Sequence, residues 1–598
     1  MEEQQHQERG RGEGGGHICQ CLSQIGRIRR DSVFTIFENR RKTGLQFVES
    51  VQSLSLGLSN LGLKTGDIVA IAALNSDFYL EWMLAVAYVG AILSPLNYRW
   101  SLEEATSALL LLKPVMLVFD QSCAFWYFDL QTYNLSFLRW HVCLGDTANL
   151  PFDFVHHIAN SAAAVIPSES LKTSVQVSSS LEYQWAPEGV VLICFTSGTS
   201  GRPKGVAIGH TALIVQSLAK ISIVGYSKDD VYLHTAPLCH IGGISSGMAM
   251  LMIASCHVIL PKFESRSVLE AIEQHHVSSL ITVPAMMADL ISCIRSCKSW
   301  KAGIFLKKIL NGGGQLSAEL IRDATEIFSN AKLISAYEHV IEICRGMLVS
   351  NNLLYTSMTE TCSSLTFMTL KQSSCRVSEG QYRSISEVQS DLVNHMGVCV
   401  GKPAPHVELS VSGNGSFSIG RILTRGPHVM LKYWNQAPLK ISDSQCQGWL
   451  DTGDIGCMDD YGDIWLVGRA NDRIKSGGEN VYPEEVETIL MQHPGVSSIV
   501  VVGVPDARLS EMVVACLQIK ENWMWVNQNS HPPERKELQL TNESLYNYCK
   551  EKKLTRFKIP KIFIPWRRPF PLTSTGKLRR DEVRREAILQ LHLYPSKL

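Results

Sequence analysis

Short apolar runs alternate with longer amphipathic segments along most of this chain. Helix-like spacing of apolar and charged positions over residues 33–61 and 81–93 predicts helices. Buried strands are predicted for the apolar runs at 68–73, 115–120, 190–198, 257–261 and 279–284. Because strands and helices alternate, we expect an α/β fold for this part of the chain.

The pattern changes near residues 469–472, where the strand-like DIWLVG is followed by a polar stretch. Beyond it, PEEVETILMQH predicts a helix and SSIVVVGV a strand, which indicates a second, α+β core. A chain of 598 residues is too long for a single core. We therefore expect a disordered or targeting extension at 1–31, a large domain at 32–470 and a small domain at 471–598.

Bulk composition excludes several classes of function. The chain has 56 basic and 56 acidic residues and no long basic block, so a nucleic-acid partner is not expected. The longest apolar runs, at 82–93 and 244–259, are too short or too interrupted to span a membrane. The 17 cysteines follow no CxxC framework, which favours reduced thiols over disulfides or a zinc site.

The two ends of the sequence differ in character. The first 16 residues are polar and rich in glycine, so disorder is expected and a secretory signal is not. The last three residues, Ser596, Lys597 and Leu598, match a peroxisomal address. We expect a peroxisomal import receptor to bind them.

A loop of glycines and hydroxyl side chains, FTSGTSGRPKGV at 195–206, is the strongest chemical signal in the chain. Its glycines allow the backbone to approach a ligand closely, and its hydroxyls and Lys204 can hold phosphate oxygens. It is not a Walker loop, because Lys204 is followed by Gly205 rather than Ser or Thr. The loop predicts a polyphosphate site, and the alternative is a flexible surface loop.

Three more motifs follow: WLDTGD at 449–454, GRANDRIKSGGENVYP at 468–483 and PLTSTGK at 571–577. Together with the phosphate loop they resemble the signatures of the adenylate-forming superfamily, which includes acyl-CoA synthetases and luciferases. The resemblance implies a large N-terminal domain of mixed sheets and helices and a small mobile α+β C-terminal domain. It also implies that ATP and a carboxylate form an acyl-adenylate, from which the thiol of CoA displaces AMP.

The resemblance implies a role for individual residues. Lys577 and Lys204 are expected to be catalytic, because a carboxylate that approaches a polyphosphate needs nearby cations. Asp454 and Arg469 would contact the ribose. The full set of residues expected to bind ATP is Thr196, Ser197, Gly198, Thr199, Ser200, Gly201, Lys204, Gly312, Gly313, Tyr337, Asp454, Arg469 and Lys577.

Other positions relate to the acyl group and to the second step. His240, Gly242 and Gly314 are expected to contact the acyl substrate, although a lone His is often structural and glycines often form plain turns. Asn471 corresponds to the hinge, where many relatives have Asp or Lys. Gly477 and Gly478 would form the loop that serves the CoA step, because one site that runs two reactions needs a conformational exchange.

One expected motif, Tyr-Gly-Met-Thr-Glu, is split in this chain. Tyr337 is separated from Met358-Thr359-Glu360 by the segment 338–357, where the superfamily has one glycine. The resemblance implies that Tyr337 stacks on adenine and that Glu360 binds Mg²⁺. We hypothesise that the insertion is a translated intron or a gene-model error that weakens binding of Mg·ATP.

Further strings, such as SPLNYRWSLEEA and PLCHIGGISSGMAMLM, resemble the plant 2-succinylbenzoate:CoA ligases of phylloquinone biosynthesis. That resemblance implies ATP, Mg²⁺ and CoA as cofactor and co-substrates, 2-succinylbenzoate as substrate, and the peroxisome, with the chloroplast as a second site. The alternatives are a 4-coumarate- or fatty-acid-type ligase, and a catalytically impaired splice form that binds ATP without turnover.

Overall fold

The computed structural model describes most of the chain. It covers residues 16–123, 129–130, 133, 135–145, 165–173, 182–197, 203–297, 300, 302–312, 316, 318–337, 359–371, 398–412, 420–435, 448–469, 474–481, 483–526, 538–571 and 580–593.

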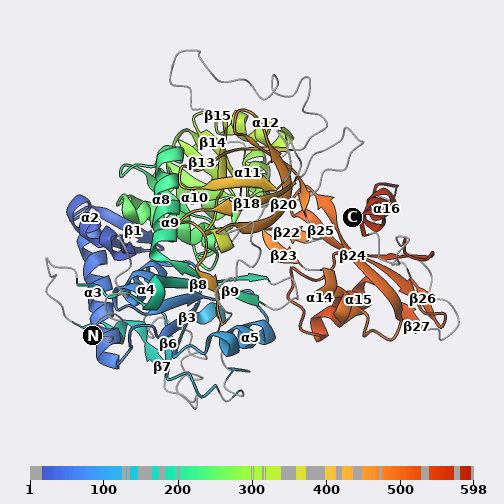
Figure 1. Cartoon of the computed structure of the whole chain (residues 1–598), viewed down its shortest axis with the longest axis horizontal. Helices are drawn as coiled ribbons and strands as arrows, with labels where there is room; N and C mark the ends of the chain where they lie inside the picture. Colours follow the sequence, from blue (N-terminus) through green and yellow to red (C-terminus); the bar gives the residue numbers. More distant parts are fainter. Residues whose placement is uncertain are drawn as a thin grey trace.

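Two large sheets form the N-terminal domain (Figure 1). The first runs β17-β18-β20-β21-β16-β15-β14-β13-β12-β10-β11-β1-β2, and the second β19-β9-β8-β4-β3-β5-β6-β7. Strands of the first sheet are β1 (Val33–Phe37), β2 (Arg40–Thr43), β10 (Val231–His234), β11 (Cys256–Ile259), β12 (Ser279–Thr282), β13 (Lys308–Asn311), β14 (Lys332–Tyr337), β15 (Thr366–Lys371), β16 (Val398–Pro403), β17 (Glu408–Ser412), β18 (Gly420–Arg425), β20 (Leu450–Met458) and β21 (Ile464–Arg469). Those of the second are β3 (Ile68–Ala72), β4 (Ile92–Pro95), β5 (Met116–Phe119), β6 (Trp140–Cys143), β7 (Val165–Pro167), β8 (Val190–Ser197), β9 (Pro203–Gly209) and β19 (Lys432–Tyr433).

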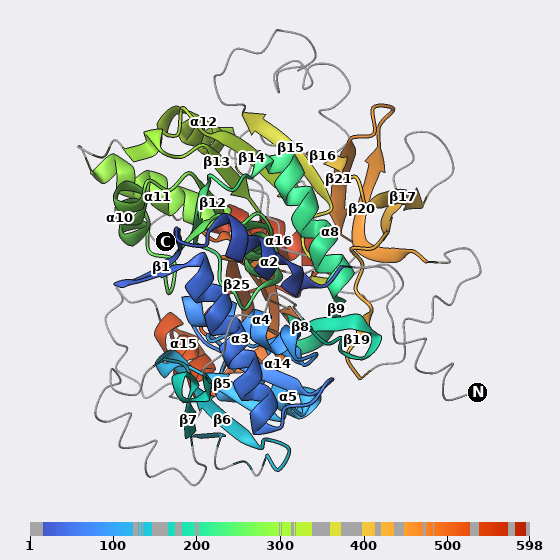
Figure 2. The same ribbon diagram turned by 90° about the vertical axis from the view of Figure 1, so that its left-hand side faces the viewer.

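Helices cover the faces of both sheets. They are α2 (Cys21–Ile28), α3 (Gly44–Leu61), α4 (Asp77–Tyr88), α5 (Leu102–Leu112), α8 (His210–Lys220), α9 (Ile241–Met252), α10 (Ser265–His275), α11 (Pro284–Ser296) and α12 (Ala318–Ile327). Alternate residues of a strand point to opposite faces, so Ile309 packs against α10 to α12 and Leu310 against α8 and α9. Because α9 also packs on the second sheet through Met248, α8 and α9 lie between the two sheets (Figures 1 and 2).

The C-terminal domain is a smaller α+β unit. Its elements are β22 (Ile474–Ser476), β23 (Glu479–Val481), α14 (Pro483–Leu490), β24 (Val496–Asp506), β25 (Ser510–Ile519), β26 (Trp523–Trp525), β27 (Leu538–Leu540), α15 (Asn542–Glu551), β28 (Ile562–Pro565) and α16 (Arg580–Leu593). α14 and α15 pack on one face of the β24–β25 pair, and α16 packs on the other. Figure 1 shows this unit beside the large domain, in orange and red.

Three sequence-based expectations differ from the structure. The predicted extension at 1–31 is partly folded, because α2 is helical and Leu22 and Ile25 are buried in the main core. The helix predicted over 33–61 begins only at Gly44, since the β1–β2 hairpin precedes it. The helix predicted over 81–93 ends at Tyr88 and a strand follows, because the apolar period does not separate a buried helix from a buried strand.

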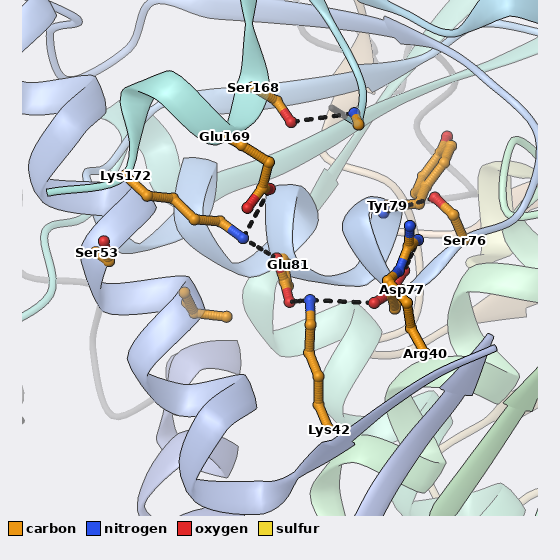
Figure 3. Close-up of polar contacts among 12 residues, drawn as sticks. Arg40, Lys42, Ser53, Ser76, Asp77, Tyr79, Glu81, Ser168, Glu169 and Lys172 are labelled. Atoms are coloured by element: carbon orange, nitrogen blue, oxygen red, sulfur yellow. Dashed lines mark hydrogen bonds and ion pairs between the residues drawn. The ribbon is translucent and has the colours of Figure 1, made fainter. Parts of the chain in front are cut away.

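Ion pairs to two buried carboxylates join β2 to α4 (Figure 3). Glu81 forms ion pairs with Lys42 and with Lys172. The Nζ atom of Lys172 lies 3.0 Å from Glu81 Oε2. Asp77 forms ion pairs with Arg40 at 2.7 Å and with Lys42 at 3.0 Å. Both carboxylates are only 1% exposed, so each depends on these cations for compensation.

Candidate functional site

The phosphate-loop residues extend an antiparallel hairpin. β8 and β9 pair so that Thr196 lies opposite Lys204, and Ser197 lies opposite Pro203. The hairpin therefore directs both flanks of the loop to one end of the sheet. The tip with Gly198, Thr199, Ser200 and Gly201 lies outside the described residues.

An aromatic residue connects Lys204 to Glu360. Lys204 Nζ lies 5.3 Å from the ring centroid of Tyr433, within the range of a cation–π contact. The Tyr433 hydroxyl donates to Glu360 Oε1 at 3.0 Å. Since β19, which carries Tyr433, pairs with β9, the cation expected to bind phosphate and the carboxylate expected to bind metal lie close together.

The two halves of the split motif return to the same sheet. β14 ends at Tyr337, which lies opposite Thr366 of β15. Glu360 lies in a short 3-10 helix, η8 (Thr359–Thr361), shortly before β15, and its carbonyl accepts from the Met430 amide at 2.8 Å. The backbone thus keeps both halves near the same end of the β14–β15 pair. Met358 and the insertion 338–357 lie outside the described residues.

The two expected ribose residues are cross-strand neighbours. Asp454 in β20 lies opposite Arg469 in β21. Asp454 is fully buried, and its amide donates to Thr452 Oγ1 at 3.2 Å. Gly453 has φ +73°, so the DTGD turn uses a conformation that glycine adopts easily.

The acyl-side residues follow parallel strands β10 and β13 of the first sheet. His240 caps α9 shortly after β10, and Gly242 lies in the first turn of that helix. Gly312 follows β13, and its amide donates to the Thr282 carbonyl at 2.9 Å. The carboxyl ends of parallel strands are the usual place for ligands in α/β sheets. Gly313 and Gly314 lie outside the described residues.

The loop expected to serve CoA faces His240. Gly477 and Gly478, with φ +60° and +86°, form the two-residue turn between β22 and β23. This turn presents Glu479, which pairs with Arg99. Glu479 Oε1 also lies 3.4 Å from His240 Nε2 and 3.3 Å from the Asn97 amide nitrogen. We call Asn97, Arg99, His240 and Glu479 the Glu479 cluster.

The members of the Glu479 cluster shift one another's pKa values, and the guanidinium of Arg99 also lies 3.4 Å from His240 Nε2. Burial alone would lower the pKa of His240, but its neighbours Cys239 and Glu479 outweigh burial and raise it to about 10. Burial would raise the pKa of Glu479, whereas Arg99 and His240 hold that pKa well below its ordinary value. The contact with Glu479 thus favours the charged form of the imidazole.

A second set of contacts joins the domains. Glu104 of α5 accepts from Lys558 and Thr555 of the C-terminal domain, and both partners are buried. Arg508 pairs with Asp289 of α11 at 2.9 Å. These contacts and the Glu479 cluster hold one defined orientation of the small domain.

Some predicted residues cannot be placed, and some contributing residues were not predicted. Lys577, Asn471 and Ser596 to Leu598 lie outside the described residues. Asn97, Arg99, Tyr433 and Glu479 were missed. Glu479 lies within the quoted GRANDRIKSGGENVYP motif and Arg99 within SPLNYRWSLEEA, so their motifs carried a signal. Tyr433 lies in none of the four ATP signatures.

This arrangement defines the class of protein. The hairpin expected to bind phosphate and the pair expected to bind ribose lie on the large domain, and the small domain presents a loop to the expected acyl side, as an adenylate-forming enzyme requires. Residues 24–337 match the family described as "AMP-binding enzyme", and residues 485–577 match "AMP-binding enzyme C-terminal domain".

Comparison with known proteins extends these matches over the whole chain. It is 49% identical to "2-succinylbenzoate--CoA ligase, chloroplastic/peroxisomal" of Arabidopsis thaliana, over 97% of this chain and 99% of that one. The amide bond synthetase McbA of Marinactinospora thermotolerans is 23% identical, with TM-score 0.71 over 96% of this chain and 99% of that one.

The o-succinylbenzoate CoA synthetase of Bacillus subtilis is also 23% identical to this chain, and two of its solved complexes resemble the present structure to different extents. A double mutant bound with its product analogue OSB-NCoA gives TM-score 0.66, and the complex with ATP and magnesium gives 0.56. Each comparison covers 94% of this chain and 98% of that one.

The chain therefore belongs to the AMP-binding enzyme family, and it is an adenylate-forming ligase that uses ATP and CoA. The expected fold class is confirmed. The predicted location, the peroxisome with the chloroplast as a second site, is confirmed by the compartments that the Arabidopsis relative carries in its name. Among the described residues, no helix is both long and apolar enough to cross a membrane.

Proposed function

We propose that this enzyme joins 2-succinylbenzoate to CoA through an acyl-adenylate, with release of AMP, in phylloquinone biosynthesis. The observation that carries the proposal is 49% identity over 97% of the chain to a ligase named for this substrate. The site supports it, because the phosphate hairpin, the ribose pair and the loop with Gly477 and Gly478 occur together in one chain.

In the first step, a carboxylate must approach the α-phosphate against the charge of the triphosphate. Lys204 and the loop hydroxyls would hold the terminal phosphates, and Asp454 would accept the ribose hydroxyls beside Arg469. Lys577 would bridge the carboxylate and the α-phosphate. Groups of this kind act by offsetting charge in the transition state, and the loss of one typically costs about a hundredfold in rate.

Glu360 fits a magnesium ion that arrives with ATP. Mg²⁺ is commonly held by one or two carboxylates together with substrate phosphates and water, so a site of three protein ligands is not required. Among the described residues, no group of three or more His, Cys, Asp or Glu side chains could hold a metal. The half-buried Glu360 is oriented by Tyr433, which contacts Lys204 on the phosphate side. Bound there, Mg²⁺ would neutralise phosphate charge.

The domain orientation fits the second step. The Gly477-Gly478 turn faces the acyl side, and the carboxylate of Glu479 favours the charged form of His240. In its charged form, His240 would donate a hydrogen bond and would not accept the proton of the CoA thiol. The higher similarity to the product-analogue complex than to the ATP complex of the Bacillus enzyme supports this assignment.

The substrate is tested by a carboxylate panel. ATP–pyrophosphate exchange and CoA thioester formation should be fastest with 2-succinylbenzoate. Preference for 4-coumarate or for a long-chain fatty acid would replace the proposed substrate by the corresponding alternative. This measurement requires no variant.

Lys577→Ala tests the assignment of the catalytic residue. We expect adenylate formation to fall by about a hundredfold or more. Lys520→Ala, an exposed lysine of the same domain, is the matched control and should keep the wild-type rate. Unchanged adenylation in Lys577→Ala would remove the assigned role of this side chain.

The insertion leaves a second candidate, a protein that binds ATP without turnover. We propose that segment 338–357 weakens Mg·ATP binding, because it divides the ligand-binding turn between Tyr337 and Glu360. Deletion of the segment and its replacement by one glycine should raise the adenylation rate. Equal rates with and without the segment would reject this effect, and tight ATP binding without pyrophosphate release would favour the second candidate.

Import provides a separate proposal. A peroxisomal import receptor is expected to bind Ser596, Lys597 and Leu598. A fluorescent protein fused before residue 1 should enter peroxisomes, and removal of the last three residues should prevent it. Continued peroxisomal import after the removal would exclude this tripeptide as the address.

A further inference from the structure

A fully buried lysine lies where the acyl side and the metal side of the site meet. Lys220, the last residue of α8, is 0% exposed. Its Nζ donates to the hydroxyls of Ser245, Ser246 and Ser363 at 2.6, 3.2 and 3.1 Å. Lysine is almost never fully buried unless it is paired, so this position calls for a specific explanation.

Two of these hydroxyls belong to the helix that starts at His240. Ser245 and Ser246 lie in the second turn of α9. Ser245 Oγ in turn donates to the Gly242 carbonyl at 3.4 Å, a weak bond that leads back to the first turn. Lys220 is thereby linked to the segment expected to contact the acyl group.

The third hydroxyl belongs to the segment that carries Glu360. Ser363 follows η8 closely, and Gln216 supports the same segment one turn earlier on α8. The Gln216 amide nitrogen donates to the carbonyls of Thr361 at 3.0 Å and Ser364 at 2.8 Å. One face of α8 therefore holds the turn that directs Glu360.

This turn has an unfavourable backbone conformation. Cys362 and Ser363 have φ +54° and +109°, which non-glycine residues rarely adopt. Such residues persist only where the surrounding structure holds them, and they are common at functional sites. α8 itself continues after Lys220 into a π-helix, Ile221–Gly225, and π-turns are also frequent at functional sites.

We propose that Lys220 is a positioning residue, which fixes the His240 helix and the Glu360 turn relative to each other. The inference rests on the proposed function, because it takes the acyl role of the helix and the metal role of Glu360 from there. Through Ser245 and Ser246, Lys220 sets the acyl side. Through Ser363, it sets the carboxylate that would hold Mg²⁺.

Lys220→Met tests the link as a whole, since Met replaces the apolar stem of the side chain but lacks the ammonium group that donates the hydrogen bonds. Two quantities are measured: the affinity for α,β-methylene-ATP with and without Mg²⁺, by calorimetry, and the half-saturating 2-succinylbenzoate concentration in pyrophosphate exchange. We expect the gain in affinity on adding Mg²⁺ to fall about tenfold, and half-saturation to rise about tenfold.

Single serine variants separate the two sides and change the fold less. Ser363→Ala should reduce the Mg²⁺-dependent gain by about threefold and leave half-saturation unchanged. Ser245→Ala should raise the half-saturating 2-succinylbenzoate concentration by about threefold and leave the Mg²⁺-dependent gain unchanged. If Lys220→Met does not fold, these two variants decide: the same change in both quantities, or in neither, would overturn the proposal.

Lys308→Met is the matched control. Lys308 is also largely buried and pairs with Asp230 at 2.6 Å, within the same domain and away from the site. It should lower stability without changing either quantity. If Lys308→Met and Lys220→Met alter both quantities equally, Lys220 has only a general stabilising role and the proposal is wrong.

A failure of the proposed function would look different. If the wild-type protein adenylated none of the carboxylates in the panel, the substrate assignment would fall. The Mg²⁺ dependence of nucleotide-analogue binding would still compare Lys220→Met and Ser363→Ala with wild type, and wild-type behaviour of both variants there would overturn the positioning role.

Discussion

Two groups of charged side chains use similar chemistry for opposite purposes. In the Glu81 cluster, defined by Arg40, Lys42, Asp77, Glu81 and Lys172, every member belongs to the large domain. In the Glu479 cluster, the carboxylate comes from the small domain and its cations from the large one. An ion pair within one unit affects the stability of that unit alone, whereas a pair between two units also favours one orientation of the two.

Exposure shows the same difference. Asp77 and Glu81 are 1% exposed, so neither carboxylate can regain water without unfolding. Arg99 and His240 are 38% and 34% exposed, so both cations can be hydrated when the β22–β23 hairpin leaves. Separation of the Glu479 cluster is therefore easier than separation of the Glu81 cluster, as a contact that forms and breaks would require.

The largest expected effect is on stability, from Glu81→Gln. Removal of one member of a buried ion pair leaves its partners uncompensated, so we expect a loss of about 3 kcal/mol in the free energy of unfolding. Activity per folded molecule should not change. Chemical denaturation with a parallel pyrophosphate-exchange assay measures both.

Glu270→Gln is the matched control for this change. Glu270 pairs with Arg266, but both side chains are largely exposed, so the expected loss is close to zero. Equal destabilisation by Glu81→Gln and Glu270→Gln would show that burial does not distinguish the Glu81 cluster.

The pH dependence of stability should locate the same cluster. Burial would raise the pKa of Asp77, but Lys42 and Arg40 outweigh it and hold the pKa below its ordinary value. A carboxyl with a lowered folded-state pKa stabilises the protein above its unfolded pKa, and this contribution is lost as pH falls through the folded value. Burial would lower the pKa of Lys42, yet Glu81 and Asp77 raise it, so its contribution is lost only in strongly alkaline solution.

The stability difference between wild type and Asp77→Asn should therefore be constant from pH 5 to pH 9, and it should shrink below about pH 4. Denaturant titrations at each pH measure it. A difference that changed between pH 6 and pH 8 would contradict this assignment of charges.

The comparison also shows what the sequence could predict. Motifs made Lys204, Asp454 and Glu360 candidates for the site, because chemistry at a fixed spacing leaves a local signal. Asp454 and Arg469 were expected to share the ribose, and the pairing of β20 with β21 places them opposite each other. The alternating strands predicted the α/β architecture for a similar reason, since each strand is a local apolar run.

Contacts between distant segments left no such signal. Arg99 and Glu479 are 380 residues apart, and no spacing rule joins them. Lys220 stands in none of the motifs, and only the packing of α8 against α9 and η8 shows its partners. The folded segment at 18–28 was missed because its burial depends on the core that it covers.

Glu479→Gln should slow the second step while leaving stability nearly unchanged. Glutamine keeps the shape of the side chain but removes the charge that holds Arg99 and His240. We expect thioester formation from preformed adenylate to fall about tenfold, and pyrophosphate exchange to remain within twofold of wild type. Rapid-quench measurement of each half-reaction tests this, and an equal loss in both would mean that Glu479 does not select an orientation.

Glu104→Gln should give the smallest effect, because Glu104 joins the domains away from the reacting groups. Its partners Lys558 and Thr555 lie on the small domain, so loss of the charge weakens the same orientation. Gln can still accept from the Ser101 amide, as Glu104 does at 3.0 Å, so the cap of α5 is preserved. We expect thioester formation to fall about threefold with adenylation unchanged.

Glu103→Gln, an exposed neighbour in the same helical turn, should change neither step. If Glu104→Gln slowed adenylation as much as thioester formation, this contact would belong with the stabilising pairs of the Glu81 cluster rather than with those that select an orientation.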